Sequence, residues 1–176
     1  KQRDLRLGAL LHSASVNARL EPTLDVLAAM SGEFFRLSAL FGPQHGFRSD
    51  LQDNMIETPH TEDKRRKVPV FSLYSETREP TPAMLDLIDV LVIDIQDVGA
   101  RIYTFIYTMA NCLAAAARKG LPVIVCDRPN PIGGITIEGP MLEKGYESFV
   151  GQYPIPMRHG MTVGELARLF NERHGL

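Results

Sequence analysis

Three segments of this 176-residue sequence gather carboxylates, amides, arginines and histidine, namely residues 41–47, 94–103 and 127–134. Carboxyl groups and histidine can transfer protons in a reaction, and Gln44 and His45 stand in the first segment. Arginine can hold a ligand carboxylate in a bidentate pair. This mixture of groups favours a polyhydroxylated or carboxylated ligand such as a sugar acid.

Each segment follows a stretch that reads as a β-strand, because apolar runs and helical patterns alternate along the chain. The expected strands are 5–11, 37–41, 69–73, 90–95 and 121–126, and the expected helices are 22–30, 82–87, 100–119 and 163–172. This alternation predicts an α/β fold that is Rossmann-like and doubly wound, with a mostly parallel sheet and helices on both faces. Thr81 and the spacing of Thr162 and Glu165 indicate the starts of two helices.

The three polar segments are expected to meet, because ligands of open α/β sheets bind beyond the carboxyl ends of the strands. Each segment also has a structural explanation. Glycine and proline can build a turn at 41–47, Asp97 can pair with Arg101 at a helix start, and Asp127 can cap a turn. Because three such coincidences at one edge are less expected than one site, the sequence predicts a ligand site there.

Several other kinds of site are disfavoured. The formal net charge is −2, without the basic excess that nucleic-acid binding needs. Residues 12–17, after the first strand, contain no dinucleotide or Walker loop, and the chain has no Gly-x-Ser-x-Gly elbow. His45 and His159 lack metal-ligand spacing, so neither a metal nor a cofactor is expected. No apolar run has the length of a membrane span, and Cys112 and Cys126 read as core residues.

Five segments form ordered motifs over most of the chain. They are Phe41-Gly-Pro-Gln-His-Gly-Phe47, Asp94-Ile-Gln-Asp-Val-Gly-Ala-Arg-Ile-Tyr-Thr104, Asp127-Arg-Pro-Asn-Pro131, Ile137-Glu-Gly-Pro140 and Tyr153-Pro-Ile-Pro-Met-Arg-His-Gly-Met-Thr162. Together they resemble the NamZ family of exo-β-N-acetylmuramidases, from about Gly8 to the end of the chain. The resemblance implies that residues 1–176 are a single Rossmann-like N-terminal domain. A smaller C-terminal domain of the same protein, outside this chain, would form the other wall of the cleft.

The resemblance also implies an activity. Members of the family release N-acetylmuramic acid from the non-reducing ends of peptidoglycan fragments, and they use no nicotinamide. Such a peptidoglycan-derived substrate favours a periplasmic or secreted protein. The sequence contains no signal peptide, but it opens at Lys1 without a methionine, so the compartment stays open.

Individual roles follow from the resemblance and from the expected convergence of the segments. The residues expected in catalysis are Gln44, His45, Asp94, Asp97 and Glu138. The residues expected to bind substrate are Gln96, Arg101, Tyr103, Arg128, Asn130, Arg158 and His159. Within the second group, an arginine would hold the lactyl carboxylate of the sugar.

Gln44 departs from the family pattern, in which many relatives carry glutamate as the proposed catalytic acid. An amide has no proton to donate, so Asp94, Asp97, Asp127 or Glu138 would have to act instead. One alternative is therefore a sugar-binding relative whose catalysis is altered or lost.

A second alternative is a domain that mainly pairs with another domain or subunit. The apolar segment 153–157 would then be an exposed seam. The mixed-charge run 62–67 is expected to be a solvated loop with no binding role.

Overall fold

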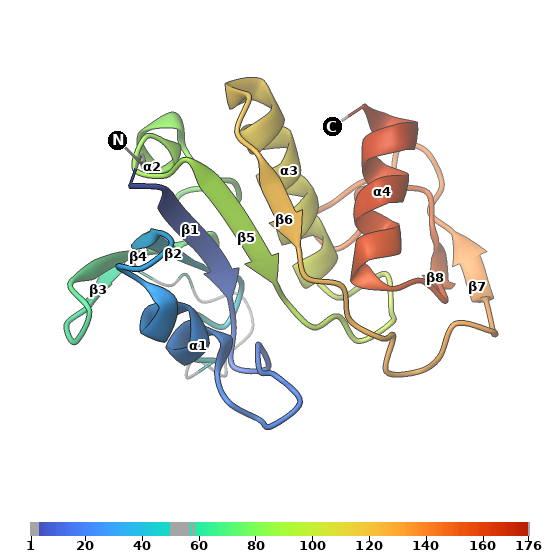
Figure 1. Cartoon of the computed structure of the whole chain (residues 1–176). Helices are drawn as coiled ribbons and strands as arrows, with labels where there is room; N and C mark the ends of the chain where they lie inside the picture. The colour runs from blue at the N-terminus through green and yellow to red at the C-terminus, as the bar shows by residue number, and fades with distance from the viewer. Residues whose placement is uncertain (1–3, 50–56, 58, 176) are drawn as a thin grey trace.

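A computed structural model describes residues 4–49, 57 and 59–175, and its centre is one six-stranded sheet (Figure 1). Its strands are β1 (Arg6–Leu11), β2 (Arg36–Gly42), β3 (Thr61–Asp63), β4 (Val68–Ser72), β5 (Val90–Asp94) and β6 (Val123–Val125). The strand order is β3-β4-β2-β1-β5-β6, and every neighbouring pair is parallel except β3 and β4. The predicted doubly wound, mostly parallel α/β fold is confirmed.

Helices lie on both sides of this sheet. They are α1 (Thr23–Met30), α2 (Pro82–Leu85), α3 (Phe105–Lys119) and α4 (Val163–His174). Residues of α2, α3 and α4 share the larger apolar core, and α1 packs against the smaller core on the other face. A two-stranded sheet of β7 (Glu138–Met141) and β8 (Pro156–Arg158) lies beyond α4 in Figure 1. No helix among the described residues is long and apolar enough to cross a membrane.

The central strand β1 is closely packed on both of its faces. Its residues alternate between the two cores, so that Leu11 faces the α1 side while Gly8 and Leu10 face the α2 and α3 side. A Cβ atom at Gly8 would lie 2.7 Å from a methyl carbon of Ile88 and 3.2 Å from the Phe41 ring. Glycine is therefore needed there for close packing of the strand.

Helices α2 and α4 begin at the N-cap residues that the sequence predicts. The hydroxyl of Thr81 accepts a hydrogen bond from the backbone N–H of Met84 at 3.4 Å. The hydroxyl of Thr162 accepts one from the Glu165 N–H at 3.2 Å, and the Glu165 carboxylate accepts one from the Thr162 N–H at 2.9 Å. The predicted capping box is confirmed.

The start of α3 was predicted wrongly. The helix begins at Phe105 instead of about residue 100, and Ile102, expected to face the sheet, is 57% exposed. The cause is a long-range pairing, because the N–H of Arg101 donates to the carbonyl of Met157 at 2.8 Å and Ala100 bridges to β8. The backbone before Phe105 is therefore held against β8 and cannot continue the helix.

The structure differs from these expectations at three other places. Strand β6, expected over 121–126, covers only Val123–Val125, and Ile124 is 54% exposed. Segment 153–157 is no exposed seam, because Ile155 is 2% exposed and the Tyr153 ring stacks on Phe170 at 4.3 Å between centroids. The run 62–67 forms the end of β3 and the turn to β4, which is largely exposed as expected, but the Asp63 side chain is buried.

Candidate functional site

The strand order reverses between β1 and β5, and this is where an open α/β sheet forms its ligand crevice. The chain first runs outward from β1 to β2 and β4, and then returns to the other side of β1 through β5 and β6. Residues that follow β1 and β5 lie at this reversal, so the polar residues after β5 are where the sequence predicts them. The loop after β1 contributes His12 and Ser15, which the sequence analysis did not select.

A buried ion pair joins the ends of β5 and β6. Asp94, only 2% exposed, accepts two hydrogen bonds from the Arg128 guanidinium, at 2.6 Å from Nε and 2.9 Å from Nη2. The Thr23 hydroxyl at the start of α1 donates to the same carboxylate at 2.5 Å, and Arg128 also donates to the carbonyl of Val16 at 2.8 Å. Both side chains are thus engaged by the protein, and the pair raises the pKa of Arg128.

His12 is a buried acceptor beside this pair. Its Nε2 accepts a hydrogen bond from the Gln96 N–H at 2.8 Å, and its ring meets the edge of Phe105 at 4.7 Å. Burial lowers the pKa of His12 to about 4, although the nearby Asp94 carboxylate acts in the opposite direction. The imidazole is therefore neutral at neutral pH. Its position directly after the first strand was the signal that could have identified it.

Asp97 pairs with His159. The sequence had suggested a pair with Arg101 instead. His159 Nε2 lies 3.0 Å from Asp97 Oδ2, which also accepts the Gly99 N–H at 2.7 Å. Because His159 Nδ1 accepts the Met161 N–H at 3.2 Å, Nε2 carries the proton and donates it to Asp97. The other carboxylate oxygen, Asp97 Oδ1, is buried without a partner among the described residues.

Arg101 and Arg158 also bond acceptors of the protein, although the buried Nε of Arg158 has no partner among the described residues. Arg101 is 7% exposed and donates from Nη1 to the carbonyls of Pro140 at 2.9 Å and Ile155 at 2.8 Å. Arg158 pairs with the exposed carboxylate of Glu138 at 2.8 Å and also bonds the carbonyl of Ile132. All three arginines predicted to hold a ligand carboxylate therefore face acceptors of the protein itself.

The remaining predicted residues after β5 and β6 support loops. Gln96 donates from Nε2 to the carbonyls of Asp97 and Pro129 at 2.8 and 3.3 Å. Asn130 accepts the Ile132 N–H and donates to the Met161 carbonyl, both at 3.0 Å. Asp127 accepts the Gly164 N–H at 2.8 Å and so caps α4, and the Tyr103 ring meets the edge of Phe105 at 4.9 Å.

Gln44 and His45 lie in the tight turn that follows β2. The turn is closed by a hydrogen bond from the Gly46 N–H to the Pro43 carbonyl at 3.1 Å, and His45 has a φ of 70°. A left-handed backbone is uncommon for a residue with a side chain. Gln44 is 9% exposed, and no hydrogen bond between described residues joins it to Asp94 or Asp97.

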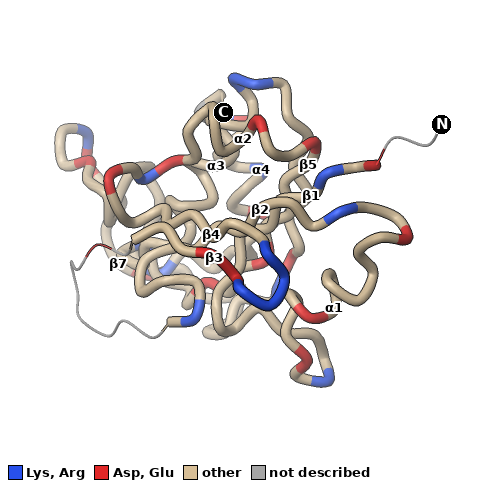
Figure 2. Tube along the Cα trace, turned by 90° about the vertical axis from the view of Figure 1, so that its left-hand side faces the viewer, with Lys and Arg blue, Asp and Glu red and all other residues tan. Residues whose placement is uncertain are grey.

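A cavity of about 1030 Å³ opens beside these residues. Its walls come from the loop after β1, the start of α1, the residues after the β2 turn and the β3–β4 hairpin, which carries the basic run seen in Figure 2. His12 and Ser15 belong both to the cavity wall and to the hydrogen-bond network at β5. Within the described part of the chain, no group of three His, Cys, Asp or Glu side chains is placed to hold a metal ion.

These features define a doubly wound α/β protein with a cavity beside the end of β1. The sequence model of "Exo-beta-N-acetylmuramidase NamZ, N-terminal" matches residues 7–176, and the chain therefore belongs to the NamZ family. It is 51% identical over 171 residues to the peptidoglycan β-N-acetylmuramidase NamZ of Bacillus subtilis strain 168. That comparison covers 97% of this chain and 41% of the relative.

Solved structures of related proteins share the fold. Two DUF1343 family proteins of Bacteroides fragilis superpose with TM-scores of 0.87 at 44% identity and 0.81 at 34% identity. Each comparison covers 99% of this chain, but only 43% and 44% of those chains. This chain thus spans less than half the length of the relatives that it matches.

The neutral, buried state of His12 predicts a pH dependence of stability. The unfolded chain binds a proton at His12 below a pKa of about 6.5, whereas the folded protein does so only near pH 4. Unfolding is therefore favoured as the pH falls from about 6.5 towards 4, and the contribution is about 2–3 kcal/mol between pH 7 and 4.5. The substitution His12→Gln, which keeps an acceptor for the Gln96 N–H, should remove that part of the slope.

Urea unfolding at pH 7 and 4.5 measures this difference. The matched control is His60→Gln, at an exposed histidine whose Nδ1 also accepts a backbone N–H, from Ser72 at 3.0 Å. The assignment is wrong if His12→Gln and the parent lose the same stability between the two pH values.

Proposed function

We propose that this chain is the substrate-binding N-terminal domain, residues 1–176, of an exo-β-N-acetylmuramidase. The enzyme would release N-acetylmuramic acid from the non-reducing ends of peptidoglycan fragments. The observation that carries this proposal is the 51% identity over 171 residues to the Bacillus subtilis protein of that name. The cavity beside the β1–β5 reversal supports it, because its volume of about 1030 Å³ is at the upper end of the range of ligand pockets, ~300–1,000 Å³.

The carboxylates available in this chain bear on the mechanism. Glycoside hydrolysis commonly uses two carboxyl groups that flank the glycosidic bond. Asp94 is held by Arg128 and Thr23, Asp97 is 3% exposed, and Glu138 is paired with Arg158 on β7. We therefore infer that at least one reacting carboxyl group comes from the part of the longer protein that lies outside this chain. Catalytic roles for Asp94, Asp97 and Glu138 stay predictions.

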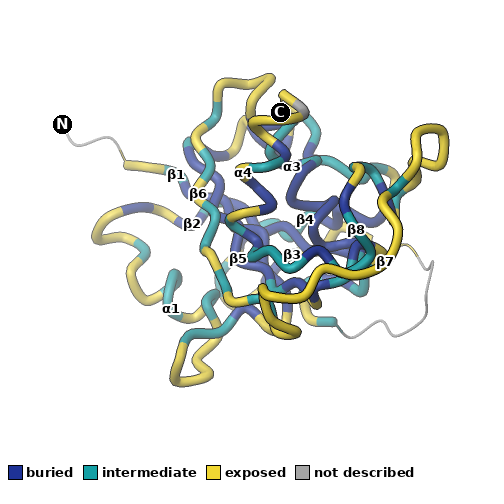
Figure 3. The backbone as a smooth tube through the Cα atoms, turned by 90° about the vertical axis from the view of Figure 1, so that its right-hand side faces the viewer, coloured by how far each residue is buried: buried dark blue, intermediate teal, exposed yellow. Residues whose placement is uncertain are grey.

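We further propose that a smaller C-terminal domain docks on residues 127–150. Figure 3 shows the segment from the end of β6 through β7 as a nearly continuous exposed stretch. It carries large apolar side chains in water, with Ile135 99%, Ile137 64% and Tyr146 73% exposed. Apolar side chains gathered on one exposed segment are typical of an interaction surface, and the relatives have the additional length that could cover it.

A sugar-binding protein without glycosidase activity is the second candidate. It is favoured by Gln44, since the family pattern has a glutamate at this position and an amide cannot donate a proton. The cavity would be retained in such a protein, and only the chemistry would differ.

The first prediction concerns activity. The full-length protein should release N-acetylmuramic acid from a MurNAc-GlcNAc disaccharide, and it should release no sugar from the GlcNAc-GlcNAc disaccharide, which lacks the lactyl group. Chromatography of the released sugars across pH 5–9 (about the range over which catalytic acids and bases titrate) measures both. A folded, full-length sample that releases nothing at any of these pH values contradicts the proposal.

Gln44→Glu separates the two candidates. In an active enzyme, we expect the variant to lower kcat by at least about tenfold, because it adds an uncompensated charge at a 9% exposed position. Gln152→Glu, at a half-buried glutamine distant in sequence, is the matched control. If the parent is inactive and Gln44→Glu creates activity, the chain is instead the altered, sugar-binding relative.

The docking surface predicts a context-dependent effect on stability. In residues 1–176 alone, Ile135→Ser with Ile137→Ser should change the free energy of unfolding by no more than about 0.5 kcal/mol per site, because both side chains are exposed. In the full-length protein, the same pair should lower the Tm by several degrees. Phe34→Ser, at a side chain that is 61% exposed elsewhere, should be neutral in both. Equal effects of the Ile pair in the two proteins would refute this surface.

A further inference from the structure

All three arginines that the sequence predicts to bind a ligand carboxylate bond groups of the protein in the structure. Other cations are therefore candidates for binding that carboxylate. Arg101 bonds carbonyls, Arg128 is paired with Asp94, and Arg158 is paired with Glu138. Freeing any of them would leave a protein acceptor or carboxylate without its partner, which is costly when that partner is buried. This cost applies to Arg101 and Arg128, whereas the partner of Arg158 is exposed. Other cations, without such partners among the described residues, line the cavity beside the site.

The β3–β4 hairpin forms the charged wall of this cavity. Its turn is an unbroken run of Lys and Arg that lies beside α1 in Figure 2. Arg66 attaches the hairpin to the rest of the protein, since its guanidinium bonds Asp63 at 2.9 Å within the hairpin and also Asp25 on α1. Burial alone would raise the pKa of Asp63, but hydrogen bonds from the Arg66 backbone and guanidinium hold it below its ordinary value. The hairpin is thus fixed against α1 by one arginine.

Three other cations of this wall do not attach the hairpin to the rest of the protein. Arg48, Lys64 and Arg65 line the cavity, are exposed, and make no ion pair with any carboxylate among the described residues. Glu62 is the one lining carboxylate of the described chain that Arg66 does not pair, because Asp25 and Asp63 are both bonded to it. Since His12 is neutral at neutral pH, the described lining carries four cations (Arg48, Lys64, Arg65 and Arg66) and three carboxylates (Asp25, Glu62 and Asp63), which is a formal excess of one positive charge.

Apolar side chains also line this cavity. They are Leu11, Leu24, Phe47 and Val70, together with prolines at 22 and 59. A ligand that suits such a mixed lining carries a carboxylate and a small apolar group. The lactyl ether of muramic acid has this character, because its carboxylate is attached to a carbon that bears a methyl group.

We propose that the β3–β4 hairpin, with Lys64 and Arg65, and Arg48 after β2 form the subsite for the anionic substituent of the sugar-acid substrate. This inference rests on the proposed function and assigns its carboxylate recognition to residues other than Arg101, Arg128 and Arg158. The exposed cations act through charge, and Arg66 acts by holding the hairpin in place.

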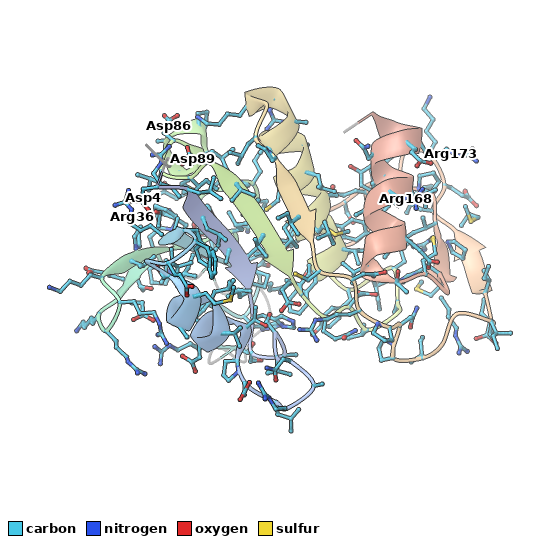
Figure 4. The ribbon with its side chains drawn as sticks, viewed as in Figure 1. Asp4, Arg36, Asp86, Asp89, Arg168 and Arg173 are labelled. Atoms are coloured by element: carbon cyan, nitrogen blue, oxygen red, sulfur yellow. The ribbon has the colours of Figure 1, made fainter. Side chains whose placement is uncertain are left out.

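The test uses the full-length protein and two pairs of charge-neutralising substitutions. Lys64→Gln with Arg65→Gln removes two cations of the subsite and leaves Arg66 intact. Arg168→Gln with Arg173→Gln removes the same charge from α4, where Figure 4 shows both side chains on the far side of the molecule from the hairpin. Thermal unfolding checks that both variants remain folded.

Calorimetric titration then compares three ligands. They are an S-linked MurNAc-GlcNAc, in which sulfur replaces the glycosidic oxygen so that the enzyme cannot cleave it, the lactyl amide of that analogue, and a muramyl dipeptide whose lactyl carboxyl group is joined to the peptide. We expect the hairpin variant to weaken binding of the S-linked MurNAc-GlcNAc on the order of tenfold, as two partly exposed ion pairs would. Binding of the uncharged amide should be unchanged, and so should binding of every ligand by the α4 variant. Weakening confined to the dipeptide would assign the subsite to peptide carboxylates instead of the lactyl group.

Two results would overturn the subsite. One is equal weakening of the acid and the amide by the hairpin variant, and the other is equal weakening of the acid by the hairpin and α4 variants. Because binding is measured without turnover, these results are independent of hydrolysis. A parent that binds the acid through the hairpin but releases no sugar would contradict the glycosidase activity and leave the subsite in place.

Discussion

The ion pair between Asp94 and Arg128 connects the parts of the chain that shape the cavity. Through Thr23 and Val16 it reaches α1 and the loop after β1, while its two partners end β5 and follow β6. Removing Arg128 would leave the buried Asp94 charge without its partner. This costs ~3–5 kcal/mol in a fully buried pair and less here, because the Arg128 side chain is 20% exposed. The hydrogen bonds between the two groups also occupy the atoms that a ligand would otherwise contact.

The elements that the sequence predicts correctly have local signals. Strand β5 is apolar on both faces, and α4 begins at a capping box whose two partners are three residues apart. The elements that it misplaces depend on distant partners. The start of α3 is set by β8, more than fifty residues further along, and β8 itself pairs with β7. Periodicity along one segment contains no information about such pairings.

The same distinction applies to the site. Residue types after the strands predict a site at the carboxyl edge of the sheet, because parallel strands end at one edge, and this location stays a prediction. Spacing suggested that Asp97 pairs with Arg101, but the structure pairs it with His159, 62 positions away. It also uses Asp127 to cap α4 through the Gly164 N–H, whereas the sequence had suggested a cap of the turn directly after Asp127. His12 has no distinctive neighbours in the sequence, since the loop after β1 lacks the glycines of a nucleotide site. Which side chains carry no ion pair among the described residues depends on contacts between distant segments, and the sequence pattern does not contain them.

The basic hairpin has a further consequence for the behaviour of the sheet itself. Strand β3 is the edge of the six-stranded sheet, and an exposed edge can pair with a strand of another molecule and begin aggregation. The edge here is only three residues long, runs antiparallel to β4, and continues directly into Lys64 and Arg65. Short edges that carry charge resist such pairing. The cations beside the cavity thus also hinder pairing of the sheet edge with other molecules. Selection for colloidal stability would preserve them even in a protein that binds no sugar.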